Sequence, residues 1–283
     1  MPDEYVKKVN EAVGFIKQKV GANFTPHASL TLGSGLGKLA ELIKPVALIP
    51  YADIPHFPQT TVAGHEGMLV VGTLEDVPIL GFKGRKHYYE VAHLPDAMDQ
   101  VTFYVQVAAS LGSKVCMTTN AAGGLNHTFK IGDLMVIRSH IGLFLPNPLL
   151  GPHHDFGNNL YFQPLNDMYS FDLLKLFKSI SPQIREGIYV AWSGRTYETQ
   201  AESLLLRKLG ADATGMSTIP EIIVAHNRGM QTLGVSIITN VIAEDGTNAT
   251  NHEEVTAVLN NQTTENKLFT TFRSFFQKLK VIG

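Results

Sequence analysis

The sequence predicts a single α/β domain in which helices flank a mixed, largely buried β-sheet. Short apolar stretches alternate with longer segments whose apolar residues recur at helical spacing, and two of the short stretches end in glycine-rich segments. Hydrophobic residues make up 44% of the 283 residues and charged residues 17%, which allows a sizeable core. No internal repeat or low-complexity linker divides the chain, so we expect residues 1–283 to form one domain.

Each predicted element has a pattern of its own. Val9, Val13 and Ile16 recur at helical spacing, which begins a set of helices predicted over residues 3–20, 38–43, 97–111, 201–209 and most of 253–280. Apolar stretches bounded by turn residues predict strands over residues 28–32, 68–71, 78–82, 114–118, 134–137, 188–191 and 234–239. Residues 143–163 are rich in Pro, Gly, Asn and His and predict a long surface loop, which is usually functional.

Composition excludes several kinds of partner. The formal net charge of -2 gives no basic surface for nucleic acid or an anionic membrane. Cys116 is the only cysteine, and the adjacent His153 and His154 are poorly spaced for one ion, so we expect no disulfide and no metal site. The N-terminal residues lack the apolar core of a secretory signal, and no stretch approaches the roughly 18 apolar residues of a membrane span. We therefore expect a cytoplasmic protein.

The glycine turn at residues 33–37 is a candidate anion site. Glycine lets backbone N–H groups approach a phosphate, the start of the following helix adds positive potential, and Ser34 can donate a hydrogen bond. The turn lacks the Gly-Lys-Ser/Thr ending of a Walker A loop, and its third glycine comes too early for a dinucleotide fold. A plain strand-to-helix turn explains the glycines equally well.

Residues 84–90, Gly-Arg-Lys-His-Tyr-Tyr-Glu, follow a predicted strand. If this segment is extended, Arg85, His87 and Tyr89 point the same way. The guanidinium can clamp a phosphate with two N–H donors, the imidazole can donate to another phosphate oxygen, and the tyrosine can close over a sugar. The alternative is a solvated charged segment.

Several further patterns suit a purine nucleoside. Tyr197 beside Glu198 offers a ring to pack on a base and a carboxylate to accept from a ring N–H. Asn240 ends a predicted strand, and its amide can donate and accept together. Residues 120–124 supply small residues at a strand's carboxyl end, where ligands often bind. Residues 215–221 combine helix-capping residues with a flexible methionine. Taken singly, each pattern also has an ordinary structural explanation.

Taken together, these segments resemble the trimeric, low-molecular-mass family of purine nucleoside phosphorylases. The resemblance runs from about residue 30 to residue 255, in the family's order, through LGSGLGKL, TTVAGHEG, GRKHYYE, TNAAGGLN, GRTYETQAE, GADATGMSTIPEIIVA, ITN and NHEEV. It implies the nucleoside phosphorylase fold, whose central sheet is partly barrel-like. Departures include Tyr104 and Gln106, where the family commonly has proline and arginine, and Thr214, where it often has valine.

The resemblance also implies roles by position. It implies a phosphate site made of Ser34, His65, Arg85, His87, the backbone at Ala121, and Ser217. It implies ribose contacts from Tyr89, Met216 and His252, and a base site made of Tyr197, Glu198 and Asn240. Phe156 is similar to the phenylalanine that a neighbouring subunit places over the ribose, which implies a homotrimer.

The implied reaction is the reversible phosphorolysis of 6-oxopurine nucleosides such as inosine and guanosine. Asn240, His87 and Glu198 are then the catalytic residues, phosphate is a co-substrate, and no cofactor is needed. An Asn rather than an acid at position 240 disfavours a methylthioadenosine-cleaving phosphorylase. A nucleoside hydrolase would need an acidic cluster to activate water, and a non-catalytic nucleoside-binding homologue is the third alternative.

Overall fold

A nine-stranded mixed sheet forms the centre of the computed structural model, which describes residues 3–62, 64–151, 154–157, 160–248 and 251–282. Its strands are β1 (Ala28–Leu32), β2 (Lys44–Pro50), β3 (Met68–Leu74), β4 (Val77–Lys83), β5 (Val115–Gly124), β6 (Leu134–Ile141), β7 (Arg185–Ala191), β8 (Ala213–Gly215) and β9 (Gln231–Val241).

The sheet closes on itself over part of its width. The strand order is β2-β3-β4-β1-β5-β8-β7-β6-β9, and β9 also pairs in parallel with β5. This pairing joins β5, β8, β7, β6 and β9 into a closed barrel, from which β1, β4, β3 and β2 extend as an open sheet. The expected mixed, partly barrel-like sheet is therefore confirmed.

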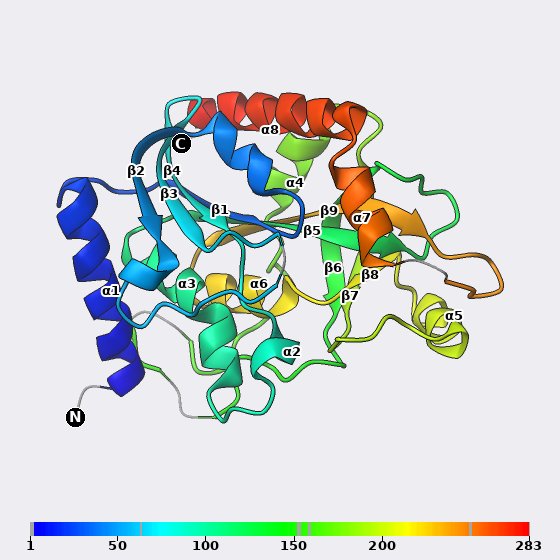
Figure 1. Cartoon of the computed structure of the whole chain (residues 1–283), viewed down its shortest axis with the longest axis horizontal. Coiled ribbons are helices and arrows are strands. Elements are labelled where there is room, and N and C mark those ends of the chain that lie inside the picture. The colour runs from blue at the N-terminus through cyan, green and yellow to red at the C-terminus, as the bar shows by residue number, and fades with distance from the viewer. Residues whose placement is uncertain (1–2, 63, 152–153, 158–159, 249–250, 283) are drawn as a thin grey trace.

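Helices cover both sides of the sheet (Figure 1). On one side α1 (Glu4–Val20) contacts α3 (Ala97–Ser110), which in turn contacts α6 (Ile219–Asn227). On the other side α4 (Phe171–Lys178) contacts the long α8 (Gln262–Ile282). The remaining helices are α2 (Tyr88–Val91), α5 (Gln200–Lys208), α7 (His252–Leu259) and the 3-10 helices η1 (Gly37–Leu42) and η2 (Tyr51–Asp53). All five residues of β1 are buried between these layers.

Some predicted boundaries are wrong. The strand predicted over residues 114–118 continues through the glycine-rich segment to Gly124, with a bulge between Ala122 and Gly123. The short helix predicted after Gly33 is the 3-10 helix η1, so it offers a weaker N-terminal dipole than expected. The C-terminal helical stretch consists of two helices, and β2, β8 and α4 were not predicted.

None of the described helices combines the length and the apolar character needed to cross a membrane.

Candidate active site

A pocket of about 750 Å³ lies where the chain leaves several strands. The segments after β1, β4 and β7 and the last residues of β5, β8 and β9 all reach its wall. The predicted site residues that line it are Ser34, Arg85, His87, Tyr89, Ala121, Tyr197, Glu198, Met216, Ser217 and Asn240. Strand ends thus bring together side chains that are far apart in the sequence.

Two predicted residues do not line this pocket, and the structure does not describe the side chain of a third. His65 lies just behind it, with Nε2 3.0 Å from the Ser34 hydroxyl. Phe156 lies elsewhere, with the Arg228 guanidinium 4.1 Å from the centre of its ring. His252 is the first residue of α7, and its side chain lies outside the described residues.

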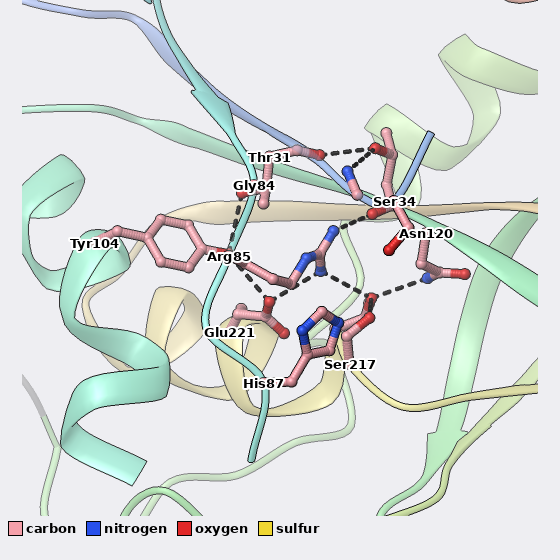
Figure 2. A network of polar contacts seen from close by, with 12 residues as sticks. Thr31, Ser34, Gly84, Arg85, His87, Tyr104, Asn120, Ser217 and Glu221 are labelled. Carbon is pink, nitrogen blue, oxygen red and sulfur yellow. Dashed lines mark hydrogen bonds and ion pairs between the residues drawn. The ribbon is translucent and has the colours of Figure 1, made fainter. Parts of the chain in front are cut away.

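Arg85 lines the pocket and lies at the centre of a network of polar contacts (Figure 2). Its side chain is 1% exposed, and Nη1 donates to Glu221 Oε1 at 2.9 Å, in an ion pair whose two members are equally buried. Nη2 donates to the Thr119 carbonyl, whereas Nε has no hydrogen-bond partner among the described residues. Burial is the largest single effect and lowers the pKa of Arg85, but Glu221, Tyr104 and Tyr189 together outweigh it and raise the pKa. The guanidinium therefore stays charged, and its Nε–H donates to no described residue.

A glycine allows the guanidinium to approach the turn after β1. A Cβ on Gly33 would lie 2.7 Å from the Thr119 carbonyl oxygen and 3.0 Å from Arg85 Nη2. Any larger residue would displace one of these groups. The glycine turn is therefore explained by packing against Arg85 as well as by access for an anion.

Thr218 precedes α6 in an unusual backbone conformation. Its φ of 76° lies in the left-handed region, which β-branched residues rarely adopt. Its buried hydroxyl accepts from Asn120 Nδ2 at 2.9 Å and lies 3.2 Å from the Ser217 hydroxyl. These contacts hold the strained turn and fix Ser217 at the pocket wall.

His65 is held neutral at the edge of this cluster. Burial and, secondarily, the nearby His87 lower the pKa of His65 to about 3. One ring nitrogen contacts the Arg85 backbone and the other contacts Ser34. An anion that enters beside this neutral imidazole would favour its protonated form and so raise its pKa.

The segment that carries His87 and Tyr89 differs from the prediction. It is extended only as far as His87, because the Glu90 carboxylate accepts from the His87 N–H at 2.6 Å and so starts α2. The two rings nevertheless stack, with centroids 4.9 Å apart, and both face the pocket. Burial would raise the pKa of Glu90, but hydrogen bonds from His87 and Thr61 hold it well below its usual range.

Another part of the pocket wall carries an acid and an amide. Glu198 is 8% exposed, and its Oε1 accepts from Thr214 Oγ1 at 2.5 Å. The Asn240 amide lies 3.4 Å from Thr239 Oγ1 on its oxygen side and 3.4 Å from Asn248 Oδ1 on its nitrogen side. These neighbours orient Oδ1 as an acceptor and Nδ2 as a donor. The aromatic ring of Tyr197, which is 42% exposed, lies at the rim.

The sequence did not single out every residue in the wall. Thr61, Asn120, Arg195 and Asn248 also line the pocket, and Glu221 lies directly behind Arg85. Thr61, Asn120, Arg195 and Glu221 stand inside the quoted motifs, so roles for them could have been proposed. Asn248 lies in an irregular segment whose path no periodicity predicts.

Within the described part of the chain, no group of three or more His, Cys, Asp or Glu side chains gathers as a metal site would require. His153, one of the two adjacent histidines, lies outside that part.

Known proteins match both the sequence and the fold. The family model of the phosphorylase superfamily matches residues 29–271. Purine nucleoside phosphorylase 1 of Bacillus subtilis is 44% identical over 256 residues, which cover 89% of this chain and 92% of that protein. Purine nucleoside phosphorylase of Mus musculus is 43% identical over 244 residues, which cover 82% of each.

Solved structures agree with the sequence relatives. The schistosoma purine nucleoside phosphorylase in complex with hypoxanthine has a TM-score of 0.86 and 36% identity, and the match covers 97% of this chain and 98% of that one. The Schistosoma mansoni enzyme in complex with inosine has a TM-score of 0.85 and 34% identity, over 96% of each chain. The chain therefore belongs to the purine nucleoside phosphorylases of the phosphorylase superfamily, enzymes that transfer the pentosyl group of a purine nucleoside to phosphate.

Proposed function

We propose that this enzyme catalyses the reversible phosphorolysis of 6-oxopurine nucleosides, such as inosine and guanosine, to the free base and (deoxy)ribose 1-phosphate. The observation that carries the proposal is the division of the polar residues in the pocket wall into two groups. A carboxylate and an amide lie on either side of Thr214 and Gly123, and an arginine, a histidine and two serines form a separate group linked through Thr218 and His65. The complexes of the Schistosoma relatives with hypoxanthine and inosine support the same class of substrate.

The phosphate binds at the group that contains Arg85 and His87. Ser34 and Ser217 donate from the turns after β1 and β8, and the backbone at Ala121 adds a contact from β5. His65, which is neutral in the empty site, donates or becomes protonated as the dianion enters. These donors replace the hydration shell of the anion.

The base binds at the group that contains Glu198 and Asn240. The N1–H of a 6-oxopurine donates to the Glu198 carboxylate, whereas the unprotonated N1 of a 6-aminopurine would face the same carboxylate with a lone pair. Tyr197 packs on the base. Tyr89, Met216 and His252 contact the ribose between the two groups.

Catalysis follows from this placement. As the glycosidic bond breaks, its electron pair stays on the purine and the ribosyl group becomes cationic. Asn240 Nδ2 donates to the purine as negative charge develops on it, and the bound phosphate faces the cationic carbon and then bonds to it. The proton of hydrogen phosphate balances the reaction and ends on the free base. Positioning of the two substrates supplies much of the acceleration.

We also propose that the enzyme works as a cytoplasmic homotrimer without metal or organic cofactor. The ring of Phe156 packs on Arg228 and does not line its own chain's pocket, which supports the role at a neighbouring subunit that the resemblance implies. The ribose would then be enclosed only in the assembled oligomer.

A substrate comparison tests the proposed function. Purified protein is given inosine, guanosine, adenosine or methylthioadenosine, each with and without phosphate, and ribose 1-phosphate and free base are measured. We expect phosphate-dependent cleavage of inosine and guanosine and weak cleavage of the other two. Equal cleavage of inosine without phosphate would show a hydrolase, and a preference for methylthioadenosine would show the other phosphorylase class. Hypoxanthine binding in a calorimeter without turnover would show a non-catalytic protein.

A further inference from the structure

Tyr104 on α3 is a buried tyrosine that does not line the pocket. Its hydroxyl contacts Glu221, the ion-pair partner of Arg85. The residue is 5% exposed, and its hydroxyl lies 3.1 Å from Glu221 Oε1 and 3.1 Å from Thr31 Oγ1 (Figure 2). Thr31 donates to the tyrosine oxygen, so the tyrosine proton is free to donate to the carboxylate. Burial holds the pKa of Tyr104 well above its ordinary value, which keeps this donor protonated.

The Glu221 carboxylate depends on this hydroxyl. Its Oε1 accepts from both Arg85 Nη1 and Tyr104, whereas Oε2 has no hydrogen-bond partner among the described residues. A buried carboxylate with few donors is poorly solvated and must rely on its cation. The Tyr104 hydroxyl therefore stabilises part of the negative charge of Glu221, which Arg85 would otherwise stabilise alone.

The hydrogen bond from Tyr104 to Glu221 also affects how well Arg85 can donate to an anion in the pocket. Two of its nitrogens are engaged by Glu221 and the Thr119 carbonyl, and Nε remains without a partner. If the tyrosine hydroxyl is lost, the Glu221 carboxylate interacts more strongly with the guanidinium, and no group on α3 holds the carboxylate in position. Both effects weaken donation from Arg85 to an anion in the pocket.

We propose that Tyr104 is a positioning residue of the phosphate site, which holds Glu221 by its hydroxyl and through Glu221 sets the orientation and free charge of Arg85. This inference rests on the proposed role of Arg85 in binding phosphate. Four elements meet in the relay, because Thr31 lies in β1, Tyr104 in α3, Glu221 in α6 and Arg85 after β4.

The test is Tyr104→Phe, which keeps the ring and removes only the hydroxyl. Loss of one hydrogen bond to a charged group predicts a rise of about three- to tenfold in the KM for phosphate. The KM for inosine should stay within about twofold, because the base-binding group is untouched. Tyr169→Phe is the matched control, since the Tyr169 hydroxyl bonds His140 Nδ1 at 3.0 Å away from this pocket. Thr31→Val, which loosens the tyrosine hydroxyl, should raise the KM for phosphate less than Tyr104→Phe.

A second measurement does not depend on turnover. Phosphate alone should raise the melting temperature of the wild-type protein more than that of Tyr104→Phe, and Tyr169→Phe should respond as the wild type does. An unchanged KM for phosphate in Tyr104→Phe, or an equal rise in both KM values, overturns the inference. If the wild type itself shows no phosphate dependence in either measurement, the proposed function fails instead.

Discussion

At the scale of single residues, Asn240 is the group on which base preference depends. Its amide is oriented by Thr239 on one side and Asn248 on the other, so that Nδ2 is the donor available to a base. Gly123 lies beside the amide, since a Cβ there would be 3.4 Å from Asn240 Nδ2. A hydrogen-bond donor at this place can stabilise the negative charge that develops on a leaving purine.

Asn240→Asp should reverse the preference of the enzyme. A carboxylate removes the donor to the leaving purine, so we expect kcat/KM for inosine to fall by about 100-fold or more. A carboxyl group at the same place can interact with a 6-amino group, so activity on adenosine should rise. Steady-state kinetics on both nucleosides measure the effect. A parallel loss on both substrates would show that Asn240 only supports the structure.

Glu198→Ala should weaken nucleoside binding and leave phosphate binding unchanged. Loss of the acceptor for N1–H predicts a rise of about tenfold or more in the KM for inosine. Thr214→Val is the comparison, because it removes the hydroxyl that donates to Glu198 but keeps the carboxylate for the base. A rise in the KM for phosphate of Glu198→Ala would contradict the division of the pocket wall into two groups.

At the scale of helices and strands, prediction succeeded where a pattern is long and buried. The α1 helix carries Val9, Val13 and Ile16 on its buried face, and the sequence shows that spacing directly. The β2 strand lies at the sheet edge, and its short apolar run of residues 46–49 stands between Pro45 and Pro50, which argue against a strand. The β8 strand has three residues, too few for a period.

Other elements were missed although their sequences contain local evidence for them. The α4 helix begins after Ser170, whose side chain caps Leu173 N–H, and buries Leu174 and Phe177 at helical spacing. The α2 helix depends on one capping carboxylate, Glu90, which the assumption of an extended segment overlooked. The buried pairing of Arg85 with Glu221 spans 136 positions, and no local pattern reveals it.

The predicted surface loop is attached to two helices by one histidine. His154 Nδ1 contacts the Asp3 carboxylate at the start of α1, and Nε2 lies 3.0 Å from Asp99 Oδ1 in the first turn of α3. The Tyr5 ring covers it at 4.4 Å between ring centres. Asp99 chiefly, with Asp3, raises the pKa of His154 to about 9 against the opposing effect of burial.

His154→Gln should therefore lower stability in a way that depends on pH. The folded pKa lies above the ordinary value of 6.5, so the ion pairs stabilise the fold fully below that value and are lost as pH rises through about 9. We expect the variant to melt a few degrees below the wild type at about pH 6, and the difference to shrink towards about pH 10. Paired thermal melts measure it. A difference that does not change with pH would show that only packing was lost.

At the scale of the whole molecule, the barrel explains how the site is assembled. Closure of β9 onto β5 brings Asn240 beside Gly123, and the open sheet brings Arg85 beside Thr119. The resemblance to a known family implied roles for Arg85 and Asn240. The spacing of residues along the chain could not show that they share one pocket. Among the predicted contacts whose side chains the structure describes, His65 lies just behind the pocket and Phe156 lies away from it.

Mixed oligomers should show whether Phe156 acts across subunits. Phe156→Ala should raise the KM for inosine, because the ribose loses its aromatic cover, and Asn240→Ala should be nearly inactive. The two variants are given different affinity tags, co-expressed and purified over both tags, so that each oligomer contains both. The Phe156→Ala subunit then supplies an intact Asn240, and a neighbouring Asn240→Ala subunit supplies Phe156 to the same site. We expect those sites to regain the wild-type KM for inosine, measured by steady-state kinetics. If the mixture shows only the Phe156→Ala KM, the ring acts within its own chain, where it packs on Arg228.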